Sequence, residues 1–395
     1  MPDLKSLKIP LGFSLEAGSP VYKTFLESLP YYLGAEYKTK LIADTLIFDG
    51  VPKRSMEQIT RAALDALVAA QVDHERLSEQ CLQSFEGKYD LNDGIYEDLV
   101  AQGVLFPTGH GKLAYSGMLA EVFHAVDDFF RRHCLDLGAQ QELYPPAVES
   151  ESLLRAGYFD TLAQHAYFVA PLKTSLDSLQ AARDGAVFQE SADGHLQTPG
   201  WVLSPTVCHH CFEARKDSAV VLPLKVTAIN QCSRYEVHDT HGMQRLRMYW
   251  MREYIQFDQE EKSIIDSLDH LLSITTDTLE RWGVSYQVVT ANDPFFSNSA
   301  TSKRAFQNMF ALKRELRLPI PGGSLACASF NNHQRSLVSS FNIQQRGEQI
   351  DELSANKIAS GCVGWGYDRL LFGMFTQLGV NVSAWPEQVT KDLGL

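Results

Sequence analysis

Apolar residues recur along this chain with two different periods, which predict helices in some segments and strands in others. Apolar side chains three or four residues apart predict amphipathic helices over about 116–134 and 260–282. Runs rich in β-branched and aromatic residues predict strands at 231–236, 247–257, 325–331 and 339–343. Because few helices separate these strands, the pattern favours an α+β fold with an antiparallel sheet over a doubly wound parallel sheet.

The first part of the chain, residues 1–105, reads as an accessory α/β unit that precedes a larger domain over 106–395. Residues 40–48 predict a strand that ends at an Asp-Gly pair. A helix should follow, because Ser55 and Gln58 have the spacing of a capping box. This part contains no long heptad hairpin, which argues against a coiled-coil arm, and no residues with catalytic spacing.

Two segments of the larger domain have an unusual composition. Pro145 and Pro146 follow the first amphipathic helix and cannot complete a hydrogen-bonded ladder, so they predict an edge or interface strand. A long helix that leads into such a strand often forms a dimer interface. Residues 172–200 are polar and poor in aromatic side chains, and they predict an insertion or a mobile loop.

The composition is that of an acidic globular protein, with 395 residues, a net charge of −13 and 45% hydrophobic residues. No apolar run is long enough to span a membrane, and the first residues lack the pattern of a signal peptide. The seven cysteines are odd in number and scattered, which argues against a disulfide framework and for a cytoplasmic setting. The acidic balance disfavours broad non-specific binding of nucleic acid.

Arginines gather in the central hairpin, which the strands at 231–236 and 247–257 form. They are Arg234, Arg245, Arg247 and Arg252. The planar guanidinium group can bind a phosphate or carboxylate with two hydrogen bonds, so one interpretation is an anion held between the strands. Ordinary ion pairs on a solvated hairpin are the other interpretation, and the hairpin alone does not separate the two.

Cysteines and glycines supply two further candidate sites. Cys208 and Cys211 have zinc-knuckle spacing without a second pair, which leaves one ligand of a dispersed site or simply a buried cysteine. Gly364 and Gly366 would let the backbone approach a flat ligand, with Arg369 in the first turn of the following helix. A tight turn between strand and helix would explain the same glycines.

Three segments resemble the signature motifs of class II aminoacyl-tRNA synthetases, in the same order. The helix with E-L-Y-P-P resembles motif 1, R-Y-E followed by R-L-R-M-Y resembles motif 2, and G-W-G-Y-D-R resembles motif 3. Finer matches resemble the amino acid:[carrier protein] ligases, which are truncated relatives of the zinc-dependent, archaeal-type seryl-tRNA synthetases. They are L-S-P-T-V-C-H, R-M-Y-W-M-R-E-Y, A-N-D-P-F-F, L-K-R-E-L-R-L-P-I, A-S-F-N-N-H-Q and C-V-G-W-G-Y-D-R. The resemblance covers roughly residues 105–395 and implies a class II synthetase-like antiparallel sheet flanked by helices.

The resemblance implies a catalytic zinc ion held by Cys208, Glu253 and Cys362. Three protein ligands leave one position open, which would take the α-amino group of an amino acid. The expected role of zinc is therefore substrate recognition, not activation of water. Cys211 lies near enough in sequence to be the first ligand in place of Cys208.

The resemblance also implies a site for ATP and its magnesium ion. Arg234 would bind the α-phosphate and the substrate carboxylate, Glu236 the adenine amino group, and Arg245 the γ-phosphate. Tyr249 would stack on adenine, where the family commonly has Phe, and Arg369 would cover the opposite face of the base. We expect Arg234, Arg245 and Arg369 to stabilise the charge that develops during phosphoryl chemistry.

Two further residues match substrate-pocket positions of the family, Asp293 and Asn331. The chain also departs from the family pattern at two places. Asp368 replaces the Glu that usually precedes the motif 3 arginine. Leu325 or Ala326 stands where seryl-tRNA synthetases carry an acidic residue that would ligate magnesium, so the protein ligands of magnesium stay open.

The expected activity is activation of a small amino acid by ATP and transfer of the aminoacyl group to the phosphopantetheine thiol of a carrier protein. A cytoplasmic homodimer is the expected form. A seryl-type tRNA synthetase is the alternative, although the acidic charge and the missing coiled-coil arm make tRNA an unexpected partner. A non-catalytic paralogue that acts as a binding or regulatory subunit is a third possibility, which the intact arginines and zinc ligands oppose.

Overall fold

The computed structural model describes most of the chain as two compact units. The described residues are 7–11, 15, 16, 19, 21, 22, 25, 26, 29, 33, 39–42, 44–48, 55–76, 80–185, 194–236, 242–291, 312–346 and 357–395. The first unit is formed mainly by Met1–Glu79, and the second begins at Gln80. No helix in these described ranges has the length and apolarity that crossing a membrane requires.

The second unit is built on an eight-stranded sheet with the strand order β4-β14-β15-β16-β18-β13-β12-β7. Neighbouring strands are antiparallel throughout except for β12 and β7, which are parallel. The strands are β4 (Cys81–Phe85), β7 (Gln140–Gln141), β12 (Leu224–Ser233), β13 (Met248–Asp258), β14 (Tyr286–Thr290), β15 (Lys313–Ile320), β16 (Gly323–Gln334) and β18 (Ala359–Gly366). The predicted α+β class with an antiparallel sheet is confirmed.

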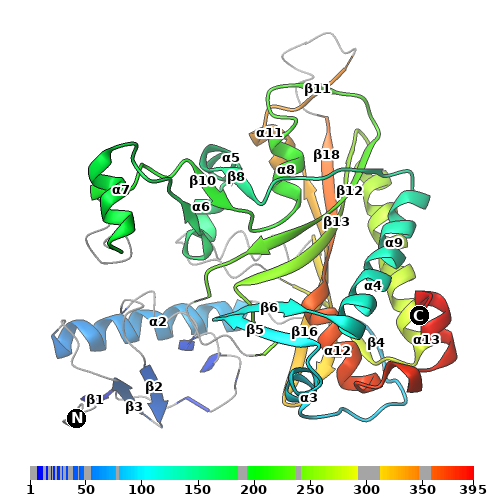
Figure 1. Ribbon diagram of the computed structural model, residues 1–395, viewed down its shortest axis with the longest axis horizontal. Coiled ribbons are helices and arrows are strands. Elements are labelled where there is room, and N and C mark those ends of the chain that lie inside the picture. The colour runs from blue at the N-terminus through cyan, green and yellow to red at the C-terminus, as the bar shows by residue number, and fades with distance from the viewer. Residues whose placement is uncertain are drawn as a thin grey trace. The chain divides into compact units, whose positions relative to one another are not determined.

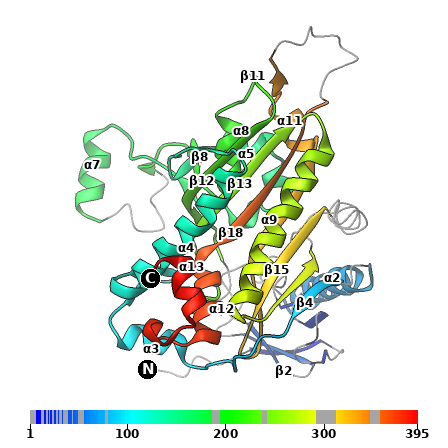
Figure 2. The same ribbon diagram turned by 90° about the vertical axis from the view of Figure 1, so that its right-hand side faces the viewer.

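Helices cover one face of this sheet and form the main core with it (Figures 1 and 2). They are α4 (Gly117–Asp136), α9 (Glu261–Trp282), α12 (Tyr367–Leu378) and α13 (Glu387–Leu393). The predicted helices over 116–134 and 260–282 correspond to α4 and α9. Aromatic rings tie the layers together, since Phe130 of α4 stacks on Trp365 of β18 with ring centroids 4.8 Å apart.

Smaller elements surround the sheet. A hairpin of β5 (Leu105–Gly109) and β6 (Lys112–Tyr115) follows α3 (Ile95–Ala101). A three-stranded sheet contains β8 (Ala147–Glu149), β10 (Trp201–Leu203) and β9 (Phe168–Val169), with α5 (Ser150–Arg155), α6 (Tyr158–Thr161), η1 (Ala163–His165) and α7 (Leu176–Arg183). The remaining elements are α8 (Cys208–Glu213), β11 (Ala219–Val220), α11 (Ser336–Ser340), β17 (Gln344–Gln345) and η4 (Val382–Ala384).

The first unit contains a three-stranded sheet and a long helix. The strands are β1 (Leu7–Pro10), β2 (Thr39–Ile42) and β3 (Thr45–Phe48), in the order β1-β3-β2, and the helix is α2 (Met56–Arg76). The capping box is confirmed, because Gln58 N–H donates to Ser55 Oγ at 3.2 Å and Ser55 N–H donates to Gln58 Oε1 at 3.0 Å. Buried Leu46 and Ile59 belong to the core of this unit.

Several local predictions were wrong, each for a physical reason. Residues 40–48 form two antiparallel strands in place of one, since Ile42 pairs with Thr45 around a tight turn. Residues 339–343 do not form the predicted strand. They contain the end of helix α11 and the turn after it, where Asn342 has a positive φ, and their apolar side chains pack into the core from there. The segment 172–200 stays a predicted insertion, but its described residues include helix α7, which Ser175 caps by accepting a hydrogen bond from Ser178 N–H at 3.1 Å.

The boundary between the two units falls near Gln80, whereas the sequence suggested residue 105. Strand β4 lies between these positions and pairs with β14 at the end of the large sheet. Its side chains are mostly exposed, so it has no apolar alternation from which its partner could be predicted.

Arg252 connects β13 to the helical layer through a buried ion pair. Its Nε and Nη2 donate to the two carboxylate oxygens of Asp127 on α4 at 2.7 and 3.0 Å, and Nη1 donates to Thr227 Oγ1 at 3.0 Å. Arg252 is 1% exposed. This arginine therefore holds α4 against the sheet and does not share an anion with the other hairpin arginines.

We predict that Asp127→Asn lowers the free energy of unfolding by on the order of 3–5 kcal/mol, because it leaves the buried guanidinium without a counter-charge. Urea unfolding monitored by circular dichroism measures this change. The matched control is Asp128→Asn, whose carboxylate pairs with Arg131 and Arg132 on the surface and should cost less than about 1 kcal/mol. Equal losses in the two variants would contradict the structural role of the Arg252–Asp127 pair.

Candidate active site and metal centre

The alternation of side chains along β13 separates the helical face of the sheet from a second face that carries polar groups. Arg252 points to the helices, so its neighbours Met251 and Glu253 point to the opposite face. Glu253 pairs in register with Gly364 of β18. A Cβ at Gly364 would lie at van der Waals distance, 3.4–3.6 Å, from Met251 Sδ, Glu253 Cγ and Ser329 Oγ, so these three side chains surround the glycine on this face.

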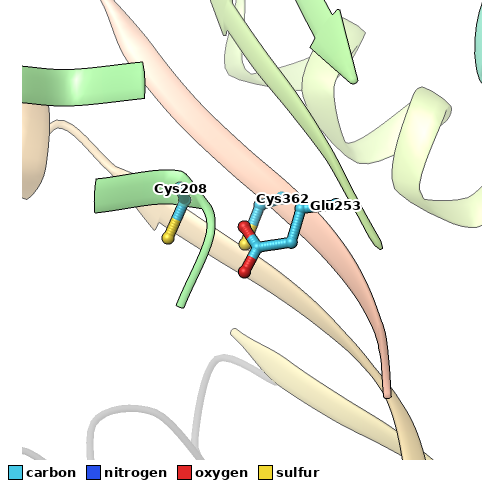
Figure 3. A group of neighbouring side chains, drawn as sticks. All are labelled: Cys208, Glu253 and Cys362. Carbon is cyan, nitrogen blue, oxygen red and sulfur yellow. The ribbon is translucent and has the colours of Figure 1, made fainter. Parts of the chain in front are cut away.

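Three possible metal ligands converge on this face from three different elements. Cys208 comes from α8, Glu253 from β13 and Cys362 from β18. One ligand atom from each residue lies within 4.8 Å of the other two, and all three residues are buried. Figure 3 shows the two sulfur atoms and the carboxylate turned toward the same space. The structure thus brings together the three residues that the sequence suggested.

Burial and like charge make these three groups unfavourable neighbours in the absence of a cation. Burial and the nearby Cys208 raise the pKa of Glu253 well above its usual range. A hydrogen bond with Cys208, together with burial, raises the pKa of Cys362, while the same bond lowers the pKa of Cys208 to about 7. Glu253 Oε2 is buried and makes no hydrogen bond within the described part of the chain. Two thiols and a carboxylate with an unsatisfied oxygen fit a zinc ion.

Each candidate ligand is held by neighbouring polar groups. Val207 N–H donates to Glu253 Oε1 at 3.2 Å, and Thr206 Oγ1 lies 3.3 Å from Cys208 Sγ. Asn331 Nδ2 donates to Cys362 Sγ at 3.5 Å and to Ser329 Oγ at 3.1 Å. Asn331, which the resemblance assigns to the substrate pocket, therefore contacts a candidate metal ligand.

The geometry separates Cys211 from this group, although it lies one turn after Cys208 on the same helix. Arg215 Nη1 donates to Cys211 Sγ at 3.3 Å and to the Cys211 carbonyl at 3.1 Å. Burial raises the pKa of Cys211 to about 12. Because a helical turn of three residues leaves some rotation between the two side chains, Cys208 reaches Glu253 while Cys211 faces Arg215 and Tyr144.

Arg234, one of the expected ATP-site arginines, lies close to the candidate metal ligands on the polar face. The Arg234 guanidinium lies 5.7 Å from the centre of the Tyr249 ring, and its Nε donates to the Pro205 carbonyl at 3.2 Å. The Tyr249 hydroxyl donates to the same carbonyl at 2.9 Å. Arg234 and Tyr249 are therefore fixed to the segment that leads into Cys208.

The loop that follows Arg234 carries two more of the expected residues. Arg245 Nε and Glu236 Oε2 lie 3.7 Å apart. Arg247 Nη2 donates to the Glu236 carbonyl at 3.1 Å, and Arg369 Nε donates to the Gln244 carbonyl at 2.9 Å. The structure thus places Glu236, Arg245 and Arg369 around one loop, while Asp293 lies outside the described residues.

Two buried polar residues near Arg234 were missed by the sequence analysis. The Tyr158 hydroxyl of α6 and the Nδ1 atom of His209 are buried without a hydrogen-bond partner in the described ranges. Their rings are 5.9 Å apart in an edge contact, and the charge of Arg234 acts on both groups. Tyr158 belongs to a four-residue helix without a motif, so no sequence signal singled it out.

Comparison with known proteins is consistent with this fold. Residues 197–375 match the family described as the tRNA synthetase class II core domain (G, H, P, S and T). Over these residues the chain is similar to that core domain. In fold it is similar to a Methanopyrus kandleri seryl-tRNA synthetase solved in complex with a tRNA, with a TM-score of 0.69, 20% identity, and coverage of 98% of this chain and 77% of that chain.

Two groups of curated relatives match this chain. A type-2 serine–tRNA ligase of Methanopyrus kandleri is 26% identical over 311 residues, which cover 72% of this chain but only 57% of the relative. Amino acid–[acyl-carrier-protein] ligase 1 of Bradyrhizobium diazoefficiens is 27% identical over 269 residues, which cover 66% of this chain and 78% of the relative. The homologues of this chain thus include both kinds of ligase that the sequence resembles.

Asp368 replaces the usual glutamate of motif 3, and its carboxylate joins three elements of the unit. It accepts hydrogen bonds from the Tyr115 hydroxyl on β6 and from Trp250 N–H on β13, the latter at 2.6 Å. Burial raises its pKa from the ordinary 3.8 to about 6, although both hydrogen bonds act in the opposite direction. The shorter side chain is thus accommodated by direct contacts with the sheet and the β5–β6 hairpin.

We predict that Asp368 makes the protein less stable as the pH rises from 4 to 7. The folded state holds this proton more tightly than the unfolded state does, so the stabilisation is complete below pH 4 and is lost as the pH rises through 6. Wild type should therefore lose about 3 kcal/mol of unfolding free energy between pH 4 and pH 7 relative to Asp368→Asn, whose amide does not titrate. Urea unfolding of both proteins at the two pH values measures this difference. Parallel pH profiles for the two proteins would contradict this prediction.

Proposed function

We propose that this protein activates a small amino acid with ATP and transfers the aminoacyl group to the phosphopantetheine thiol of a carrier protein. The observation that carries the proposal is the convergence of Cys208, Glu253 and Cys362 next to Arg234 and Tyr249 on one face of a class II synthetase sheet. A metal centre that binds an amine, placed beside cations that bind phosphate, suits a substrate with both an amino group and an activated carboxylate.

The two thiolates and the carboxylate would hold a zinc ion that offers its fourth position to the α-amino group of the amino acid. Such a site excludes hydroxy acids and N-acylated amino acids, since neither presents a free amine. A small side chain is the expectation that follows from the resemblance to the amino acid:[carrier protein] ligases.

The arginines supply the positive charge that adenylate formation needs. The substrate carboxylate attacks the α-phosphorus of ATP in line, and pyrophosphate leaves. Arg234 would hold the α-phosphate and the carboxylate, and Arg245 the γ-phosphate, with magnesium bound to the ATP itself. Tyr249 and Arg369 would enclose the adenine, whose amino group Glu236 would read. No proton has to be moved by a side chain in this step.

We favour a carrier protein over tRNA as the acceptor, on the share of each relative that this chain covers. The two amino acid–[acyl-carrier-protein] ligases of Bradyrhizobium diazoefficiens are covered by this chain over 78% and 87% of their lengths, whereas the type-2 serine–tRNA ligase of Methanopyrus kandleri is covered over 57%. The net charge of −13 also disfavours binding of a polyanionic tRNA. The expected homodimer rests on the long helix α4 and on the segment with Pro145 and Pro146 that follows it, although residues 142–146 do not form the strand that the sequence predicted.

The first test is ATP–pyrophosphate exchange with each of the twenty amino acids on zinc-loaded protein. We predict exchange with one or a few small amino acids. Cys208→Ala and Glu253→Ala should lose zinc and more than about 100-fold of this activity, since changes even in residues that only contact metal ligands cost 10–100-fold. Cys211→Ala is the matched control and should keep its zinc, because its thiol faces Arg215.

The acceptor is tested separately with the activated amino acid. Radiolabelled amino acid should appear on a phosphopantetheinylated carrier protein as a thioester that hydroxylamine cleaves, and not on the same carrier without its arm. Transfer to serine tRNA in place of the carrier would identify the chain as a tRNA synthetase. No exchange with any amino acid in zinc-replete protein would leave a non-catalytic binding subunit as the explanation.

A further inference from the structure

A β-bulge lies in strand β16 directly beside the candidate metal centre. Asn331 pairs with Cys362 and Asn332 with Gly361, but Ser360 then pairs with Gln334, so His333 is an extra residue in the ladder. Gln334 has a positive φ of 51°, and its N–H donates to Asn332 Oδ1 at 2.9 Å, which stabilises the bulge. Bulges of this kind redirect a side chain and are common next to active sites.

The bulge directs the His333 ring at two residues of the neighbouring strand. Its Nε2 lies 3.4 Å from Cys362 Sγ, and its Nδ1 lies 3.3 Å from the hydroxyl of buried Ser360. The ring also makes an edge contact with Phe212, with ring centroids 5.9 Å apart. These contacts suit a neutral ring in which Nδ1 accepts from the Ser360 hydroxyl and Nε2–H donates to the sulfur.

We propose that His333 is a positioning residue that holds Cys362 as a metal ligand by donating its Nε2–H to the thiolate. The proposal rests on the metal centre of the proposed function and extends it to a residue that contacts the ligand. Asn331 donates to the same sulfur at 3.5 Å, so Cys362 receives two N–H groups from one strand. Together they fix the direction in which the sulfur presents its remaining electron pairs.

The charge of the ligand set explains why such donors are needed. Two thiolates and one carboxylate carry three negative charges, so a divalent cation leaves the buried site with a net charge of minus one. Water cannot compensate this charge, since all three ligands are buried. N–H groups directed at sulfur stabilise it there, as hydrogen bonds to ionised groups are stronger than those between neutral groups.

His333 is not itself a fourth ligand in this geometry. Among the described residues, the atoms that lie within 4.8 Å of one another come from Cys208, Glu253 and Cys362, and the histidine nitrogens are outside this set. The ligand atom that His333 contacts is Cys362 Sγ, at 3.4 Å from its Nε2. A fourth protein ligand would also close the coordination position that the amino group of the substrate needs.

The test replaces the metal with Co²⁺, whose thiolate charge-transfer absorption reports directly on the sulfur ligands. We expect His333→Ala to weaken Co²⁺ and Zn²⁺ binding by about 10–100-fold in chelator competition. Its charge-transfer band should move to lower energy, because a sulfur that has lost a hydrogen bond gives up electron density more readily. His333→Gln can donate an amide N–H from a similar distance and should restore much of the band energy and affinity.

Ser336→Ala is the matched control for local disturbance of the strand. Its hydroxyl donates to the His333 backbone carbonyl at 2.7 Å without contacting any sulfur, so metal affinity and band energy should stay at wild-type values. Wild-type affinity and an unshifted band in His333→Ala would overturn the positioning role. Imidazole scattering in the zinc X-ray absorption spectrum of wild type, absent in His333→Ala, would make His333 a ligand and would also overturn it. Wild-type protein that shows no thiolate-to-cobalt band would instead refute the metal centre itself.

Discussion

The antiparallel pairing of β13 with β18 is the constraint on which the rest of the second unit depends. Along β13, Arg252 faces the helices and the adjacent Glu253 faces the polar side. The register places Glu253 opposite Gly364, with Cys362 two residues earlier on the same face of β18. A shift of the pairing by one residue would bury Glu253 against the helices and expose Arg252 to the site. One hydrogen-bonded ladder therefore determines both the core and the candidate site.

Fixing these side chains on a rigid sheet allows like charges to be held close together. The carboxylate of Glu253 and the two thiols are buried at separations that would be unfavourable without a cation, as the raised pKa values of Glu253 and Cys362 indicate. Their positions are maintained by polar groups from the neighbouring strand β16 and from the turn before α8. The energy of folding thus supports a preorganised site, which a metal ion and a zwitterionic substrate would then complete.

Much of the fold was predictable because its strongest elements have local signals. Helices α4 and α9 have apolar stripes, and Ser55 and Gln58 form the expected capping box. Strand β4 and helix α7 were missed, because the first has exposed side chains and the second lies in a polar segment. The segment 339–343 shows the opposite error. Its apolar residues resembled a strand, but they lie at the end of helix α11, where Asn342 has a positive φ.

The sequence by itself determined the class of the fold and the candidate metal ligands. Apolar periodicity is local and predicts helices and strands, and the resemblance of short segments to the amino acid:[carrier protein] ligases names Cys208, Glu253 and Cys362. Only the tertiary structure showed that Cys208 and not Cys211 lies with Glu253 and Cys362, and that Arg252 pairs with Asp127. It also showed that Tyr158 and His333 lie near the candidate site. These relations depend on strand register, a bulge and the rotation of a short helix. Such features arise from contacts between residues far apart in the chain, which no local pattern records.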